Sequence, residues 1–340
     1  MNLIRFITVL IAACALSTGS TAQNGTKNAP VWPTKPIKFL VGFPGGSTPD
    51  MSARTLAEPL SKLLGQPVVV ENRPGASGNI AADLVAKAND DHTFGVVING
   101  NLTSAKMLNP KLAFDPATDF SFISLLTTAP LILVTNADKP VGAAFFTAAK
   151  AAGNTWNYGS VGAGSVAHLG IELLKARAQG LDAVHVPYAG NPQVVTAMIG
   201  GQVQMALIPP GVAMPQVRAG KLKAVGVAGG RSPLVPELPS LTEAGITGYN
   251  LEVWTALVGS ANLPKAVQDK LSAAVVRILR EEETRQRLFN QGWRAVGTSP
   301  EGLRLRVKDE AAQLGAIIRS RGITVEYSIQ RLDFPFWSHL

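Results

Sequence analysis

Short apolar runs alternate with amphipathic stretches from Pro36 onward, and this alternation limits the possible folds more than any other feature of the sequence. Residues 37–43, 68–70 and 93–98 predict buried strands, and residues 51–64 and 79–88 predict the helices between them. Strands that alternate with helices are typical of α/β folds, because each crossover helix covers a parallel strand pair. The first hundred residues therefore predict one doubly wound half.

A second series of the same kind begins near Leu131. It predicts strands over 131–135, 155–158 and 183–186, helices over 143–151 and 165–178, and further units through 203–208 and 222–227. The last third, 264–322, is mostly helical with a strand near 293–296, and we expect it to return to the first half. The prediction is a two-lobed α/β fold, each lobe a mostly parallel sheet flanked by helices. Lobe 1 is expected over 32–133 and 254–326, lobe 2 over 134–253, and a tail over 327–340.

Residues 1–22 have the organisation of a secretory signal peptide. Arg5 precedes an apolar run over 7–16, and Ser20 and Ala22 supply the small residues of a cleavage site. The run is too short for a spanning helix, which needs about 20 apolar residues. An alternative is that Ile11-Ala12-Ala13-Cys14 is a lipobox and Cys14 carries a lipid anchor. Cleavage after Ala22 would remove Cys14, the one cysteine, which excludes disulfides, cysteine zinc sites and a cysteine nucleophile.

The basic charge of the chain favours an anionic partner of small size. The 340 residues carry a formal net charge of +8, yet only 16% are charged. Lys and Arg are scattered, and over 277–321 they alternate with Asp and Glu as on solvated helix faces. No aromatic and basic residues interleave as in a base-stacking platform, so nucleic acid is not an expected partner.

The junction between the first strand and the first helix is a candidate anion site. Thr48 is expected as the N-cap, Pro49 in the first turn, and Asp50 opposite the positive end of the helix dipole. Glycines let the backbone approach a ligand, and the first helical N–H groups favour an anion. Such turns are also common in α/β proteins without any ligand. The candidate ligand-binding residues here are Pro44, Gly45, Gly46, Ser47, Thr48 and Asp50.

The same arrangement recurs at the junction before the helix at 165–178. Ser165 is the expected N-cap, and His168 in the first turn is either an anion donor or a partly buried cap residue. Two helix N-termini that face each other across a cleft would clamp an anion from both sides. The segment 162–167 also fits a G-x-G-x-x-A fingerprint, but no acidic residue ends the next strand, so a dinucleotide is not expected. The candidates are Ser160, Gly162, Gly164, Ser165 and His168.

Uncharged hydrogen-bonding residues follow other strands in both halves: Asn99, Asn101 and Thr103 in the first, Tyr188 and Asn191 in the second. They suit the orientation of a ligand and are poor acids or bases. The four histidines, at 92, 168, 185 and 339, lack the spacing of a zinc site, and no nucleophile elbow is present. We therefore expect binding without catalysis, and neither a metal nor a cofactor.

Several stretches resemble the Bug family, the solute-binding proteins of tripartite tricarboxylate transporters. The similar segments are 36–38, 43–54, 64–75, 157–169, 186–188, 219–222 and 239–245. The resemblance implies a monomeric, periplasmic Venus flytrap clamp whose loops 43–50 and 159–165 hold a carboxylate and deliver it to membrane permease subunits. His92 departs from the pattern, which usually has a tyrosine there. A sensor that signals to a membrane receptor, or a secreted enzyme that reuses the fold, remains the alternative.

Overall fold

The computed structural model describes residues 31–324, so the expected signal peptide, Cys14, His339 and the tail over 327–340 lie outside the described residues. The strands are β1 (Ile37–Val41), β2 (Val68–Asn72), β3 (Thr93–Ile98), β4 (Phe120–Asn136), β5 (Asn157–Ser160), β6 (Val184–Pro187), β7 (Met205–Ile208), β8 (Leu222–Ala228), β9 (Glu252–Ser260) and β10 (Arg294–Ala295). The helices are α1 (Thr48–Leu64), α2 (Asn79–Ala86), α3 (Asn99–Leu102), α4 (Ala105–Leu108), α5 (Ala143–Ala152), α6 (Val166–Ala178), α7 (Asn191–Ile199), α8 (Pro210–Arg218), α9 (Lys265–Arg280), α10 (Glu282–Asn290) and α11 (Pro300–Arg321), with 3-10 turns η1 (Ala76–Gly78) and η2 (Gly153–Thr155).

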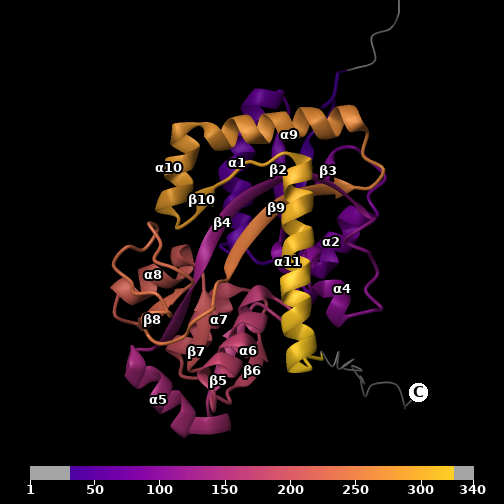
Figure 1. Cartoon of the computed structure of the whole chain (residues 1–340). Coiled ribbons are helices and arrows are strands. Elements are labelled where there is room, and N and C mark those ends of the chain that lie inside the picture. Colours follow the sequence, from indigo (N-terminus) through magenta and orange to yellow (C-terminus); the bar gives the residue numbers. More distant parts are fainter. Residues whose placement is uncertain (1–30, 325–340) are drawn as a thin grey trace, which may run out of the picture.

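The long strand β4 belongs to two sheets and joins the two halves of the molecule (Figure 1). Its first part, up to Pro130, pairs with β9 and β10 in the sheet that also contains β1, β2 and β3. Its last part, from Leu131, pairs with β7 and β8 in the sheet that also contains β5 and β6. We call the half of the molecule built on the first of these sheets lobe 1, and the half built on the second lobe 2.

The two-lobed α/β architecture is as predicted, but the expectation of mostly parallel sheets is wrong for the strands that join the lobes. β1 pairs in parallel with β2 and β3, and β5 pairs in parallel with β6 and β7. In contrast, β4 is antiparallel to each of its partners, and β9 is antiparallel to β3. The reason is that β4 leaves lobe 1 and β9 returns to it, so the two strands run side by side in opposite directions.

Helices cover both faces of the sheets and bury the central strands on both sides, while β2 and β6 at the edges stay partly exposed. Phe39, Leu56 and Leu271 bring β1, α1 and α9 into one core cluster, which also extends into lobe 2 through Leu133 of β4. On the other face of lobe 1, Val97 and Leu303 pack in a second cluster with β9. Doubly covered parallel strands read as continuous apolar runs, which explains why they could be located in the sequence.

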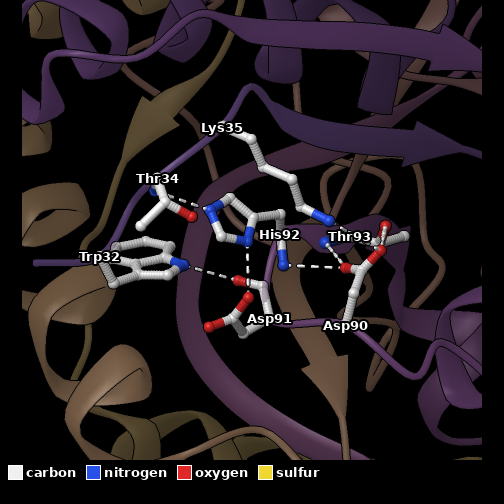
Figure 2. Close-up of polar contacts among 7 residues, drawn as sticks. All are labelled: Trp32, Thr34, Lys35, Asp90, Asp91, His92 and Thr93. Carbon is white, nitrogen blue, oxygen red and sulfur yellow. Dashed lines mark hydrogen bonds and ion pairs between the residues drawn. The ribbon is translucent and has the colours of Figure 1, made fainter. Parts of the chain in front are cut away.

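A polar cluster around His92 lies where the segment before β1 meets the start of β3 (Figure 2). The His92 ring is buried between two partners: Nε2 accepts a hydrogen bond from the Thr34 backbone N–H (3.0 Å), and Nδ1 lies 2.5 Å from an Asp91 carboxylate oxygen. Trp32 Nε1 donates to the Asp91 carbonyl (2.8 Å), and Asp90 accepts from the amide of His92 (2.9 Å). His92 thus fastens the segment before β1 to the start of β3.

Candidate functional site

The β1–α1 junction begins α1 one residue earlier than the sequence predicts. Ser47 is the N-cap, and Thr48, expected as the cap, is the first helical residue, with Pro49 after it. A Pro at the second position has no N–H to satisfy, so the helix extends back to Ser47 at little cost. The Ser47 hydroxyl does not cap the helix. It is buried and has no hydrogen-bond partner among residues 31–324, which is uncommon for a buried polar group.

Asp50 folds the glycine-rich loop back onto α1. Its carboxylate accepts hydrogen bonds from the Gly46 amide (2.9 Å), Arg54 Nε (3.0 Å) and Asn72 Nδ2 (2.9 Å). Burial by itself raises the pKa of Asp50, but the bonds from Arg54, Asn72 and Gly46 outweigh it and hold that pKa below its ordinary value. The carboxylate therefore stays ionised and fixes Gly46, which has a φ of +76°.

The β5–α6 junction has the N-cap that the sequence predicts. Ser165 Oγ accepts the His168 amide (3.2 Å), and α6 begins at Val166. His168 Nδ1 accepts the Gly164 amide (3.1 Å), and Ser160 Oγ accepts the Gly162 amide (3.2 Å). These side chains point back into their own junction and hold its backbone.

The β5–α6 junction of lobe 2 lies in contact with η1 and Ser104 of lobe 1, and the β1–α1 junction of lobe 1 contacts the start of α7 in lobe 2. Ser104 Oγ of lobe 1 donates to the Gly164 carbonyl (2.6 Å), and Ser77 Oγ donates to the Ala163 carbonyl (3.3 Å). Asn191 Nδ2 of lobe 2 lies 3.4 Å from Thr48 Oγ1 of lobe 1. These contacts join segments that follow the carboxyl ends of parallel strands in the two lobes, and which of their residues bind a ligand stays a prediction.

A further contact joins Pro44 to lobe 2, where a Cβ added to Gly190 would lie 3.1 Å from the proline ring. Beside the contacts of Gly164 with Ser104 and of Ala163 with Ser77, a space of about 10 Å³ remains between Asn101 and Ser165, which is room for about one water. Gly45 and Gly46 have no neighbour within 4 Å of an added Cβ, so this stretch of the loop is open.

The α3 candidates are engaged inside lobe 1. Asn101 Nδ2 donates to Ser77 O (3.0 Å) and to Asn79 Oδ1 (2.8 Å), while Thr103 Oγ1 donates to the Asn99 carbonyl (2.7 Å). Asn99 Oδ1 is buried without a partner among the residues described. In lobe 2, Tyr188 is half-buried and lies over β5, where a Cβ on Gly159 would be 3.4 Å from its ring.

Sequence reasoning missed Ser77, Ser104 and Glu310. Ser77 lies in the turn after β2, a third parallel strand end, and the same strand-end argument would have found it. The Glu310 carboxylate accepts hydrogen bonds from Asn99 Nδ2 (2.7 Å) and Trp254 Nε1 (2.6 Å). No signal in the sequence points to this residue, because Glu310 in α11 is far from Asn99 along the chain. Burial raises the pKa of Glu310 despite these bonds.

Within residues 31–324, no three His, Cys, Asp or Glu side chains gather in a way that could hold a metal ion. In the same range, no helix combines the length and the apolar character needed to cross a bilayer.

Two α/β lobes joined by long strands, with the N-termini of α1 and α6 at contacts between the lobes, define a two-lobed binding protein. Comparison with known proteins supports this class. A Rhodopseudomonas palustris protein with bound malate, MatC, has a TM-score of 0.79 and 32% identity over 84% of this chain and 99% of its own. R. palustris Rpa4515 with adipate has a TM-score of 0.83 and 30% identity over 86% and 99%. The periplasmic binding protein BugD has a TM-score of 0.81 and 27% identity over 86% and 99%.

The model of the tripartite tricarboxylate transporter family receptors matches residues 52–323, and the chain belongs to this family of periplasmic solute-binding proteins. A relative from Pseudomonas sp. strain P51, the UPF0065 protein in the tcbD–tcbE intergenic region, is 31% identical over 312 residues. That match covers 90% of this chain and 91% of the relative.

Proposed function

We propose that this chain captures a small carboxylate between the β1–α1 and β5–α6 junctions and delivers it to the permease subunits of a tripartite tricarboxylate transporter. The observation that carries the proposal is that the starts of α1 and α6 each lie at a contact between the lobes: Thr48 contacts Asn191 of lobe 2, and Gly164 accepts from Ser104 of lobe 1. The Ser47 hydroxyl beside Thr48 is buried and has no partner among residues 31–324. Both helices exceed eight residues, and both present first-turn amides that their own ladders leave free.

The carboxylate has a preferred place in this arrangement. Thr48 at the start of α1, and Val166 and Ala167 at the start of α6, have N–H groups that precede the helical ladders. The space on the Asn101 side has room for about one water only, so we place the ligand oxygens on the Ser47 side. We propose that Gly46, Ser47, Thr48, Ser160, Gly164 and Ser165 line the carboxylate site.

The other predicted residues surround this site in supporting roles. Asp50, Asn101, Thr103 and His168 are bonded within their own lobes and hold the loops in place. We place Pro44, Gly45, Gly162, Asn99, Tyr188 and Asn191 around the ligand or at the contact between lobes.

The ligand class follows from the family and the net charge. Structures of two relatives hold adipate and malate, and the basic chain suits an anion of two carboxylates. We propose dicarboxylates as the first class to test, without any catalytic step.

We also propose that the chain is exported to the periplasm, with cleavage after Ala22, and acts there as a monomer. A lipid anchor on Cys14 is the alternative to that cleavage. We also propose that the chain crosses between the lobes near 133/134 and 253/254, a few residues from the point between Pro130 and Leu131 where β4 changes partners.

Titration calorimetry of the mature chain with adipate and malate, after native mass spectrometry to detect any co-purified ligand, tests the proposal. Ser47→Ala should weaken binding by about 10- to 150-fold, because a hydrogen bond to a charged group contributes about 1.5–3 kcal/mol. Ser52→Ala is the matched control on α1: its hydroxyl bonds Thr48 O and Thr127, so stability should fall while affinity stays. Affinity that is the same in Ser47→Ala and wild type would refute this site, and conversion of the acid would point to an enzyme.

A further inference from the structure

Two histidine rings lie side by side beneath the β5–α6 junction. His168 in the first turn of α6 and His185 in β6 have ring centroids 4.1 Å apart and planes 25° apart. The ring of Tyr158 in β5 lies 4.9 Å from that of His185. His168 is 7% exposed and Tyr158 is fully buried, so this three-ring cluster is part of the wall behind the junction.

His168 holds Gly164 through a nitrogen that must be unprotonated. The Gly164 amide is a donor, and its nitrogen lies 3.1 Å from Nδ1, so Nδ1 accepts and the neutral ring carries its proton on Nε2. The His168 amide also donates to Ser165 Oγ. One residue thus fixes the glycine and the cap that lead into α6. Gly164 has a φ of +80°, which glycine adopts freely, so the bond from its amide to His168 selects one of several accessible conformations.

His185 holds the other glycine through Ser160. His185 Nε2 lies 2.7 Å from Ser160 Oγ, which also contacts the Gly162 amide (3.2 Å) and the Gly162 carbonyl (3.1 Å). A hydroxyl has one proton. All three contacts become hydrogen bonds when Ser160 donates to the carbonyl and accepts from the amide and from His185 Nε2–H. Both histidines are therefore required in the same tautomer.

The surroundings favour neutral rings. Glu172 on α6 accepts the Tyr158 hydroxyl (2.7 Å) and Lys175 Nζ (3.1 Å), while Asp182 lies 3.9 Å from Lys175. Glu172 is thus already paired, and within residues 31–324 no carboxylate is bonded to either ring. Burial lowers the pKa of His168 to about 4, and burial together with His168 and Lys175 lowers that of His185 to about 3.

We propose that His168 and His185 are a pair of positioning residues that, as neutral Nε2–H imidazoles, hold Gly164 and Gly162 so that the start of α6 faces lobe 1 and the ligand. The inference rests on the proposed carboxylate capture. Neither histidine touches the ligand: each acts through the backbone of the junction.

Matched pairs of variants separate hydrogen bonding from packing. His168→Asn places an amide oxygen near the position of Nδ1, and His185→Gln places an N–H donor near that of Nε2. His168→Phe and His185→Phe keep a ring without either group. We expect the Phe variants to bind adipate or malate at least 10-fold more weakly than wild type and the amide variants within about 3-fold. If the rings acted through packing alone, the order would be reversed.

Long-range ¹H–¹⁵N spectra at pH 7 supply a second readout that does not require a ligand. Both histidines should be Nε2–H tautomers, and the Gly164 amide should exchange faster in His168→Phe than in His168→Asn. A proton on Nδ1 of His168, or Phe variants that bind as wild type does, would overturn the inference. Wild-type protein that binds neither acid would count against the proposed function, and the tautomers and Gly164 exchange would still decide the role of the histidines.

Discussion

Gly162→Ala tests whether the β5–α6 junction touches η1 of lobe 1 when the protein binds its ligand. Gly162 has a φ of +118°, and a Cβ there would lie 2.0 Å from Ser77 Oγ and 2.9 Å from Ser77 Cβ in the opposite lobe. The Ser77 hydroxyl can rotate away, which gives up its bond to the Ala163 carbonyl. Its Cβ cannot move without the backbone, so the lobes must separate by several tenths of an ångström.

The expected size of the effect follows from that overlap. Inserting a methyl group into a packed contact costs about 1–3 kcal/mol, which is a factor of about 5 to 150 in the equilibrium between closed and open lobes. The apparent affinity falls by the same factor, because only the closed form makes both sets of contacts. Backbone strain at the positive φ weakens folding as well, but it is present in open and closed forms alike.

Two further variants make the prediction refutable. Gly180→Ala is the strain control in lobe 2: its φ is +82°, and a Cβ there meets nothing within 4 Å, so affinity should stay within about 3-fold of wild type. Ser77→Gly removes the opposing atoms at a residue whose φ is already +57°, and should restore binding to Gly162→Ala. Calorimetry with adipate or malate would refute the contact if Gly162→Ala matched Gly180→Ala, or if Ser77→Gly gave no recovery.

Three further predictions concern stability and loop order. His168 and His185 are neutral in the fold and charged in the unfolded chain below about pH 6.5, so the free energy of unfolding should fall from pH 7 toward pH 4. His168 alone should account for about 3 kcal/mol of this fall. Urea denaturation that shows no change in stability with pH, in wild type and His168→Phe alike, would contradict this. His92→Phe should lower the free energy of unfolding by about 1–3 kcal/mol, because the Thr34 amide loses its acceptor, and calorimetry should show unchanged affinity. Asp50→Asn should weaken ligand binding and speed hydrogen exchange at the Gly46 amide, whereas unchanged exchange would show that the carboxylate does not order the loop.

Most of the helices and strands could be predicted because their signals are local. The strands at 37–41 and 93–98 are buried apolar runs, and α6 begins after a Ser whose side chain caps it. The part of β4 before Leu131 and the whole of β9 were missed because Ser and Thr residues, which the fold buries, interrupt their apolar runs, as at Ser124, Thr127 and Thr255. Their antiparallel direction depends on the route of the chain between lobes, which no local pattern records.

By itself, the sequence determined the two-lobed α/β class and the two strand–helix junctions that carry the candidate site, since glycines, caps and apolar periodicity act within a few residues. Only the tertiary structure decided what each polar side chain does there. Asp50 accepts from Asn72 of β2, Asn99 donates to Glu310 of α11, and Ser47 is left without a partner among residues 31–324. The physical reason is that hydrogen-bond partners such as Ser104 for Gly164 come from distant segments, and only packing brings them within bonding distance.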